Sequence, residues 1–274
     1  MATEALNEEP TRRVRLLVAY DGTGFAGFAV NEGVRTVAGD LTAALNRVLR
    51  HDVRITAAGR TDRGVHGWGQ VVTFSTDATH VEPGRLARSV TALCGPEIVV
   101  RAAEFAPPGF DARFSATARS YRYTIHRGRV LDPFRDAYEW HLPRALDIEA
   151  MNRAAATLLG EHDFSSFCRR PGPLPDGTPR SLVRDLRVAR WSERPDGRLR
   201  FEIEAGSFCH QMVRSVVGTL VEVGLGRRDE ASVAVARDRR DRAAVTTVAP
   251  PKGLCLWSVS YGEAAPFAEV VPHR

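Results

Sequence analysis

The fold of this chain is decided around residues 59–67, which read Gly59-Arg60-Thr61-Asp62-Arg63-Gly64-Val65-His66-Gly67. The flanks at 53–57 and 70–74 are rich in β-forming residues, and apolar and polar residues alternate before the loop. Both flanks therefore predict strands, with the loop mounted on a sheet. Functional side chains are commonly presented by loops that a rigid scaffold holds, so Asp62 is a candidate catalytic residue.

The glycines at positions 59, 64 and 67 allow positive φ and allow another molecule to approach the backbone closely. A functional loop is one interpretation of this pattern. The other is an ordinary turn in which Asp62 forms a surface ion pair with Arg60 or Arg63. The spacing alone leaves both interpretations open.

Composition indicates a globular protein without a membrane segment. The chain has 274 residues, of which 43% are hydrophobic and 26% charged, enough for one large domain or two small ones. No apolar run approaches the roughly 20 residues of a membrane span, and the acidic N-terminus lacks an apolar signal core. We therefore expect a cytoplasmic protein, with residues 1–12 as a disordered tail.

The charge and the cysteines bear on possible partners. The formal net charge is +5, and Lys252 is the only lysine, so arginine supplies nearly all the positive charge. Arginine binds phosphate bidentately and stacks on bases, which favours a nucleic-acid partner.

The four cysteines form no C-x-x-C pair, and adjacent residues such as Cys209 and His210 seldom bind one metal. We predict neither a disulfide framework nor a metal site.

A glycine pattern near the N-terminus could be mistaken for a dinucleotide site. A predicted strand at 14–20 leads into Gly22-Thr23-Gly24-Phe25-Ala26-Gly27, which matches G-x-G-x-x-G. That site requires a helix that opens within the glycines, whereas helical periodicity begins only at Thr36. No nucleotide cofactor is predicted.

The remaining elements predict an α+β fold. Helices are expected at 83–94, 148–159, 208–223 and 229–237, and strands at 98–100, 119–125, 181–191, 199–204 and 254–261. Strand, helix and paired strands occur in both halves, so a duplicated design is expected.

Arg214 lies in the apolar run 208–223, where a buried charge needs a carboxylate or phosphate partner. A structural ion pair and a functional site are both compatible with it.

Two further loops carry basic or aromatic residues. The segment 107–114 begins with Pro107-Pro108 and contains Phe110, Asp111, Arg113 and Phe114. Its composition suits base stacking beside a phosphate, but Phe110 and Phe114 could equally pin the loop to the core. The segment 169–180 is long and basic, and loops of that length tend to be functional or disordered.

Several separate stretches together resemble the bacterial tRNA pseudouridine synthase A (TruA) family. They occur in family order between residue 13 and about residue 262, which makes the resemblance specific. The matching stretches are Tyr20-Asp21-Gly22-Thr23, Gly59-Arg60-Thr61-Asp62, Gly64-Val65-His66, Phe110-Asp111-Ala112-Arg113-Phe114-Ser115-Ala116, Tyr121-Arg122-Tyr123, Gly160-Glu161-His162-Asp163-Phe164, Met212-Val213-Arg214, and Pro250-Pro251 with Gly253-Leu254.

The resemblance implies a pseudouridine synthase fold of two similar ferredoxin-like halves that share a continuous, mostly antiparallel sheet flanked by helices. The halves would be 13–115, with the catalytic loop, and 116–262, with a tail at 263–274. It also implies isomerisation of uridine to pseudouridine in the tRNA anticodon stem-loop, without cofactor or metal, by a homodimer.

The same resemblance assigns roles to individual residues. Asp62 is the expected nucleophile, Arg214 its cationic partner, Tyr121 the ring that stacks on uracil, and Leu254 a residue of the base pocket. The expected RNA-binding residues are Arg60, Phe110, Asp111, Ala112, Arg113, Phe114 and Arg180.

The chain also departs from the family pattern. The family usually has a Gly-Trp-x-x-Gln stretch and a glutamine after Thr-Val, where this chain has 27–31 and Thr36-Val37-Ala38. Arg63 replaces a usual alanine, and Cys255 a frequent aromatic residue. These departures motivate one alternative, the same chemistry on a free nucleotide or another RNA. A non-catalytic tRNA binder or chaperone is a second alternative, motivated by the basic charge and the aromatic loop.

Overall fold

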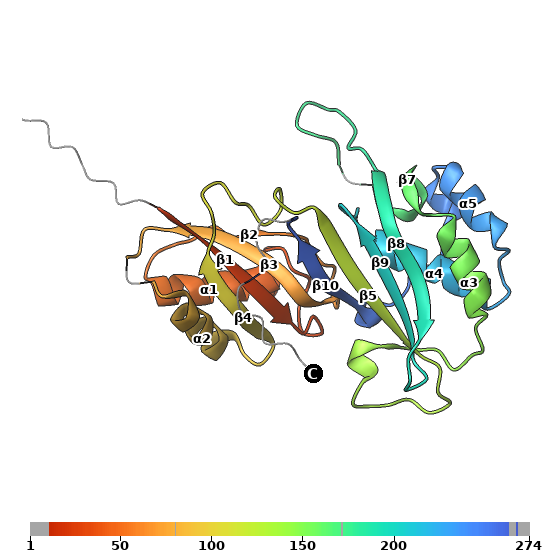
Figure 1. Ribbon diagram of the computed structural model, residues 1–274, viewed down its shortest axis with the longest axis horizontal. Helices are drawn as coiled ribbons and strands as arrows, with labels where there is room; N and C mark the ends of the chain where they lie inside the picture. The colour runs from red at the N-terminus through yellow and green to blue at the C-terminus, as the bar shows by residue number, and fades with distance from the viewer. Residues whose placement is uncertain (1–10, 80, 171, 263–266, 268–274) are drawn as a thin grey trace, which may run out of the picture.

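The computed structural model describes residues 11–79, 81–170, 172–262 and 267, and the chain forms an α+β fold around one mixed sheet of ten strands (Figure 1). The strand order is β4-β1-β3-β10-β5-β9-β8-β7, with β2 beside β3 and β6 beside β5. The strands are β1 (Arg12–Tyr20), β2 (Thr56–Ala57), β3 (His66–Thr76), β4 (Ile98–Phe105), β5 (Ala118–His126), β6 (Trp140–His141), β7 (Gly160–Asp163), β8 (Val183–Glu193), β9 (Leu199–Ala205) and β10 (Leu254–Ser260).

Helices lie at both ends of this sheet. Figure 1 shows α1 and α2 at the end that carries β4, and α3, α4 and α5 at the end that carries β7. The helices are α1 (Val37–Leu49), α2 (Pro83–Cys94), α3 (Ile148–Ala156), α4 (Met212–Gly224) and α5 (Ala231–Asp238). Within the described residues, no helix combines the length and apolarity needed to cross a membrane.

The centre of the sheet is a short parallel pairing between β3 and β10. Cys255 pairs with His66 and Leu256 with Gly67, whereas the other neighbours along the main strand order are antiparallel. This junction brings the strand that follows the Asp62 loop beside the C-terminal strand. It therefore joins segments that are distant in sequence at the middle of the molecule.

Two hydrophobic cores lie on one face of the sheet. The first contains Tyr20 with side chains of α1 and α2, and the second contains Leu256 with side chains of α3 and α4. Tyr20 pairs with Gly67, and Gly67 pairs with Leu256. Because directly paired residues project to the same side, both cores share one face. A side chain at Gly67 would collide with the Tyr20 ring, since its Cβ would lie 2.4 Å from a ring carbon.

The helix boundaries follow from local signals. Thr36 accepts the Gly39 N–H as the N-cap of α1, and Asp147 accepts the Ala150 N–H as the N-cap of α3. Helix α2 spans the predicted 83–94. Helix α4 begins at Met212, later than the predicted residue 208, because Gln211 adopts left-handed backbone angles (φ 65°, ψ 0°).

Other expectations need correction. The predicted strand at 53–57 is limited to Thr56–Ala57, since the Val53 N–H bonds to the Asn46 side chain and not to a neighbouring strand. Cys168 and Cys209 form a disulfide that cysteine spacing did not predict, because they are 41 residues apart and the fold brings their Cα atoms to 5.8 Å. Strand β1 begins at Arg12, inside the predicted tail 1–12; the rest of that tail except Thr11 and most of 263–274 lie outside the described residues.

Arg119 in β5 ties several segments together. Its buried guanidinium donates to the carbonyl oxygens of Ala58 (3.0 and 3.1 Å), Arg113 (2.6 Å), Ala116 (3.2 Å) and Gly206 (2.5 Å). Burial lowers the pKa of Arg119. These acceptors lie before the Asp62 loop, before β5 and after β9, so one side chain fixes the ends of three segments.

Replacing Arg119 by alanine or lysine should lower the free energy of unfolding by about 3 kcal/mol, because buried carbonyls lose charged donors that a lysine cannot replace together. Urea unfolding would measure this change. Arg190→Ala is the control, since that exposed arginine makes one ion pair of 3.6 Å and should change stability by less than about 1 kcal/mol. A lysine variant as stable as the parent would contradict the predicted role.

Candidate active site

The loop that carries Asp62 is fixed at its base by a buried glutamine. The Gln70 side chain accepts the Gly59 N–H (3.3 Å) and donates to the Gly59 carbonyl (2.6 Å). The Ala58 N–H also bonds to the Val71 carbonyl (2.8 Å). The loop thus leaves the sheet in a defined direction. Of the three glycines singled out in the sequence, only Gly64 has positive φ (75°).

A second loop supports the first from the N-terminal side. The Phe28 N–H donates to the Thr61 carbonyl (3.0 Å), and the Tyr20 hydroxyl shares a hydrogen bond with the Thr61 hydroxyl (2.8 Å). Gly22 approaches the Val65 backbone so closely that a Cβ would lie 2.1 Å from the Val65 oxygen. The 20–28 segment therefore braces the Asp62 loop and does not open a nucleotide-binding helix.

The Asp62 carboxylate lies close to two side-chain nitrogens from the C-terminal part of the chain, and the arginine donates a hydrogen bond to it. Arg214 Nη1 lies 3.1 Å from Oδ2, and His210 Nε2 lies 3.3 Å from Oδ1. The side chains of Asp62, Arg214 and His210 are 21%, 15% and 47% exposed. The carboxylate is thus partly buried, with the arginine on its more enclosed side.

Arg214 is held independently of Asp62. Its Nε donates to the Ala249 carbonyl (2.8 Å), and the Ala249 N–H donates back to the Arg214 carbonyl (3.0 Å). The sequence left open which group would neutralise this arginine. The structure identifies Asp62 as its carboxylate partner, which makes the surface-turn interpretation of Asp62 wrong.

Tyr121 and Leu254 lie in the adjoining core. Tyr121 is buried in β5, where Leu256 pairs with it, and its ring contacts Phe208 edge to face at 5.2 Å between centroids. Burial, with a smaller effect from the Asp62 charge, raises the pKa of Tyr121, so its phenol is neutral. Leu254 is buried in β10 and pairs with Tyr123. Tyr121 and Leu254 belong to the same hydrophobic core as Val65, three residues after Asp62.

His210 is a contact of Asp62 that our sequence analysis missed. We considered it only as a metal ligand beside Cys209. The available signal was its position four residues before Arg214, a spacing that puts two side chains on one side of a helix; in the structure the left-handed Gln211 lies between them. Within the described chain, no group of three or more metal-ligating side chains lies together.

The residues expected to bind RNA separate into buried and exposed groups. Phe110 and Ala112 are buried; Phe110 contacts the Tyr261 ring, and Ala112 accepts the Tyr261 hydroxyl. Asp111 accepts from Arg13 and from the N–H groups of Arg113 and Phe114. Phe114, by contrast, is 80% exposed. The segment is pinned to the core by Phe110 but not by Phe114.

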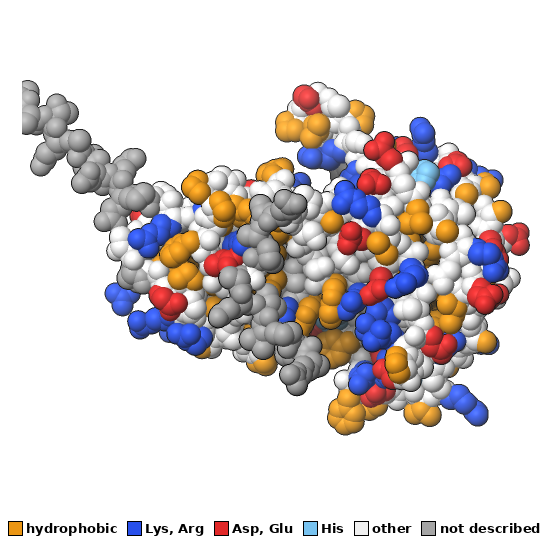
Figure 2. Space-filling model, viewed as in Figure 1, with side chains coloured by type: hydrophobic (Ala, Val, Ile, Leu, Met, Phe, Trp, Pro, Cys, Tyr) orange, Lys and Arg blue, Asp and Glu red, His pale blue; other side chains and the backbone are white. Residues whose placement is uncertain are grey.

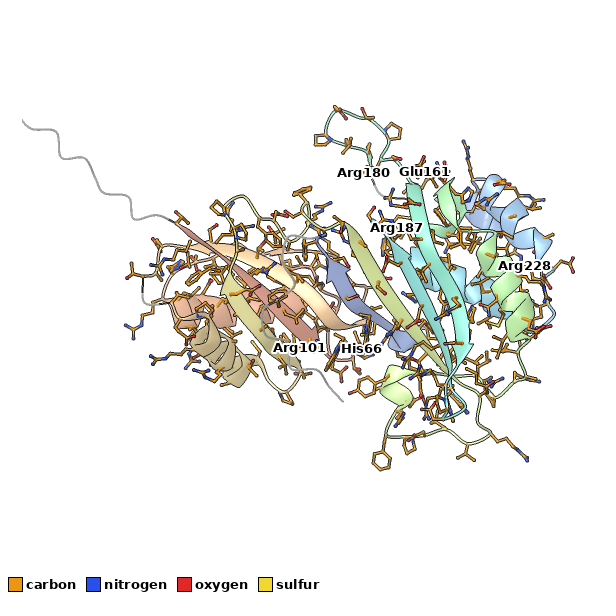
Figure 3. The ribbon with its side chains drawn as sticks, viewed as in Figure 1. His66, Arg101, Glu161, Arg180, Arg187 and Arg228 are labelled. Carbon is orange, nitrogen blue, oxygen red and sulfur yellow. A yellow bond between two sulfur atoms is a disulfide. The ribbon has the colours of Figure 1, made fainter. Side chains whose placement is uncertain are left out.

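The remaining predicted RNA contacts are on the surface. Arg60 and Arg113 are exposed, as is Arg180. Figure 3 places Arg180 at the projecting loop next to Arg187 and Glu161, away from His66 at the centre. On the face drawn in Figure 2, arginines alternate with acidic residues over β8 and β9, as in the pairing of Glu202 with Arg122 and Arg190. That face is not uniformly basic.

Comparison with known proteins gives a consistent match. A family model described as tRNA pseudouridine synthase matches residues 154–262. Curated relatives named tRNA pseudouridine synthase A match nearly the whole chain. The Frankia casuarinae protein is 45% identical over 265 residues, covering 94% of this chain and 93% of its own length. The proteins of Geobacillus sp. (strain WCH70) and Brevibacillus brevis are 37% and 39% identical, covering 92% and 91% of this chain and 99% and 100% of their own lengths.

Gly22→Ala should displace the loop that carries Asp62, because the added methyl group would overlap the Val65 backbone. We expect a loss of about 1–3 kcal/mol in the free energy of unfolding, the usual range for overpacking. Urea denaturation would measure it. Gly172→Ala is the control, since nothing lies within 4 Å of its Cβ position. Equal stability of the two variants would contradict the close packing at Gly22.

Proposed function

The chain belongs to the tRNA pseudouridine synthase A family, and we propose that it converts uridine to pseudouridine in the anticodon stem-loop of tRNA with Asp62 as nucleophile. The ion pair between Asp62 and Arg214 carries this proposal, because it joins residues 152 positions apart at the centre of the sheet. A carboxylate held by a fixed guanidinium beside a buried phenol suits this reaction.

The isomerisation breaks the N1–C1′ bond, rotates the uracil while it is held, and forms a C5–C1′ bond. The Asp62 carboxylate serves as the nucleophile, at the sugar or at the base, and afterwards leaves. A flipped-out uridine would remove water from the carboxylate, which disfavours its charge. Arg214 offsets this effect through its positive charge and needs no rearrangement, since Ala249 already fixes it.

Tyr121 is the proposed stacking partner of the uracil ring. Its raised pKa means that the phenol is protonated in the free enzyme, which supports stacking as its role before any part in removing the C5 proton. Leu254 borders the same core and is the proposed apolar wall of the base pocket. Arg60, Arg113, Phe114 and Arg180 are exposed and are proposed to contact RNA, whereas Phe110, Asp111 and Ala112 support the segment 107–116.

The finer aspects of fold and assembly are also proposals. Two separate hydrophobic cores support two similar ferredoxin-like halves, 13–115 and 116–262. We also propose a cytoplasmic homodimer, as the family resemblance implies.

Two alternatives remain distinct from this proposal. The altered stretch 27–38 motivates action on a free nucleotide or another RNA, and activity on anticodon stem-loops comparable to that of other family members would count against it. A non-catalytic tRNA binder or chaperone has no need of a carboxylate, an arginine and a tyrosine gathered at one point. Binding of tRNA without any product would favour that second alternative.

Asp62→Asn should abolish tritium release from tRNA labelled at uridine C5, because the amide is a far weaker nucleophile than the carboxylate. The tRNA affinity of this variant should stay close to that of the parent. The measurement is tritium release in a single turnover, together with filter binding of tRNA. Normal tritium release would contradict the assignment of Asp62.

Arg214→Lys should lower the single-turnover rate at least about tenfold, because a lysine ammonium cannot reproduce both the Ala249 and the Asp62 contact. Binding of tRNA should change little. The control is Arg228→Lys, whose side chain likewise donates to a backbone carbonyl, that of Ala244, and lies far from His66 in Figure 3. If both variants are equally active, Arg214 has no special part in the reaction.

A further inference from the structure

We propose that His210 is a positioning residue for Asp62, an inference that rests on the proposed function of Asp62. Its Nε2 lies 3.3 Å from Oδ1, while Arg214 donates to the other carboxylate oxygen. This is a close contact, and an imidazole with a proton on Nε2 can donate to Oδ1 once the two groups align in the substrate complex. The two side chains therefore hold the two oxygens of the nucleophile separately.

A second donor matters because Arg214 contacts Oδ2 through Nη1 alone. The torsion of an aspartate carboxylate about its Cβ–Cγ bond has broad minima, so one contact leaves the plane of the carboxylate free to rotate. A nucleophile must be aligned closely with the carbon that it attacks. The contact from His210 to Oδ1 defines this plane.

The fold places His210 by anchoring the backbone on both sides of it. Cys209 is joined to the buried Cys168, and the Arg169 N–H donates to the His210 carbonyl (2.9 Å). On the other side, Gln211 adopts the left-handed conformation that precedes α4. Such a conformation is uncommon for a residue other than glycine and turns the chain sharply. The imidazole is therefore carried by a constrained segment although nearly half of it is exposed.

The exposure of His210 also defines the direction from which a nucleoside can approach. Ala249 and Asp62 hold Arg214 at the enclosed side of the carboxylate. The imidazole is more exposed than the guanidinium and, within the described part of the chain, has no other hydrogen bond or ion pair. Uridine must therefore reach Asp62 from the side that His210 borders, which places this residue beside the reacting carboxylate.

Two other roles for His210 fit the structure less well. A metal site would need further ligands, and the described residues contain no cluster of three or more metal-ligating side chains. The neighbouring Cys209 sulfur is already bonded to Cys168. A purely structural role would require the side chain to be packed, yet it is 47% exposed, and truncation of such a residue usually changes stability little.

The experiment compares His210→Ala with His210→Gln, whose amide nitrogen can replace the Nε2 donor. We expect kcat for tritium release from C5-labelled tRNA to fall about tenfold in His210→Ala, the effect of losing one hydrogen bond, with KM within twofold of the parent. His210→Gln should recover most of this loss. A structural role would not produce a change in kcat alone with recovery by glutamine.

The matched control is His51→Ala, which removes another histidine beside an aspartate, since His51 Nε2 lies 3.5 Å from Asp77. It should keep the parental kcat and KM. The midpoint of urea unfolding should be unchanged in His210→Ala. A kcat of His210→Ala equal to that of the parent would overturn the proposal. A rise in KM that His210→Gln does not reverse would also overturn it, because His210 would then act as an RNA contact.

Failure of this inference differs from failure of the proposed function. If the parent protein releases no tritium from tRNA, or if Asp62→Asn is fully active, the function assigned to the site is wrong. If the parent is active, Asp62→Asn is inactive and His210→Ala equals the parent, only the role of His210 is wrong. The three proteins can be assayed in one series.

Discussion

The ion pair between Asp62 and Arg214 is the interaction on which the rest of the site depends. Removing both charges from water costs free energy that the pair recovers only if further hydrogen bonds satisfy each group. Arg214 meets this condition through its hydrogen bond to Ala249, and His210 Nε2 lies 3.3 Å from the other oxygen of Asp62. Both partners also sit on rigid backbone, the loop fixed by Gln70 and the first turn of α4. The parallel pairing of β3 with β10 brings these two supports together.

Elements whose signals lie within a few neighbouring residues could be predicted from the sequence. Helix α2 depends on periodicity within one segment, and the structure has it at the predicted residues 83–94. The rejection of a dinucleotide site rested on the distance between the glycines and the helix, and α1 does begin at Val37. Asp62 was found because a glycine-rich loop between two strands is also a local pattern.

What the sequence did not reveal depends on contacts between distant segments. Charge burial alone did not identify the partner of Arg214, which is 152 residues away, and only the family resemblance implied Asp62. The disulfide of Cys168 with Cys209 was missed because those residues are 41 positions apart. The start of α4 was placed too early, since an apolar run cannot reveal that Gln211 takes left-handed angles.

In the stretch 27–38, where the chain departs from the family pattern, some residues support the Asp62 loop and others are exposed at the surface. Phe28 is buried against the Tyr20 ring, and its N–H bonds to the Thr61 carbonyl next to Asp62. Its backbone bond does not depend on the identity of the side chain, so support of the Asp62 loop persists although the usual residue is absent. Val30, by contrast, is largely exposed. A change of RNA recognition in this chain would therefore arise from the exposed residues beyond Phe28, while the geometry that holds Asp62 is preserved.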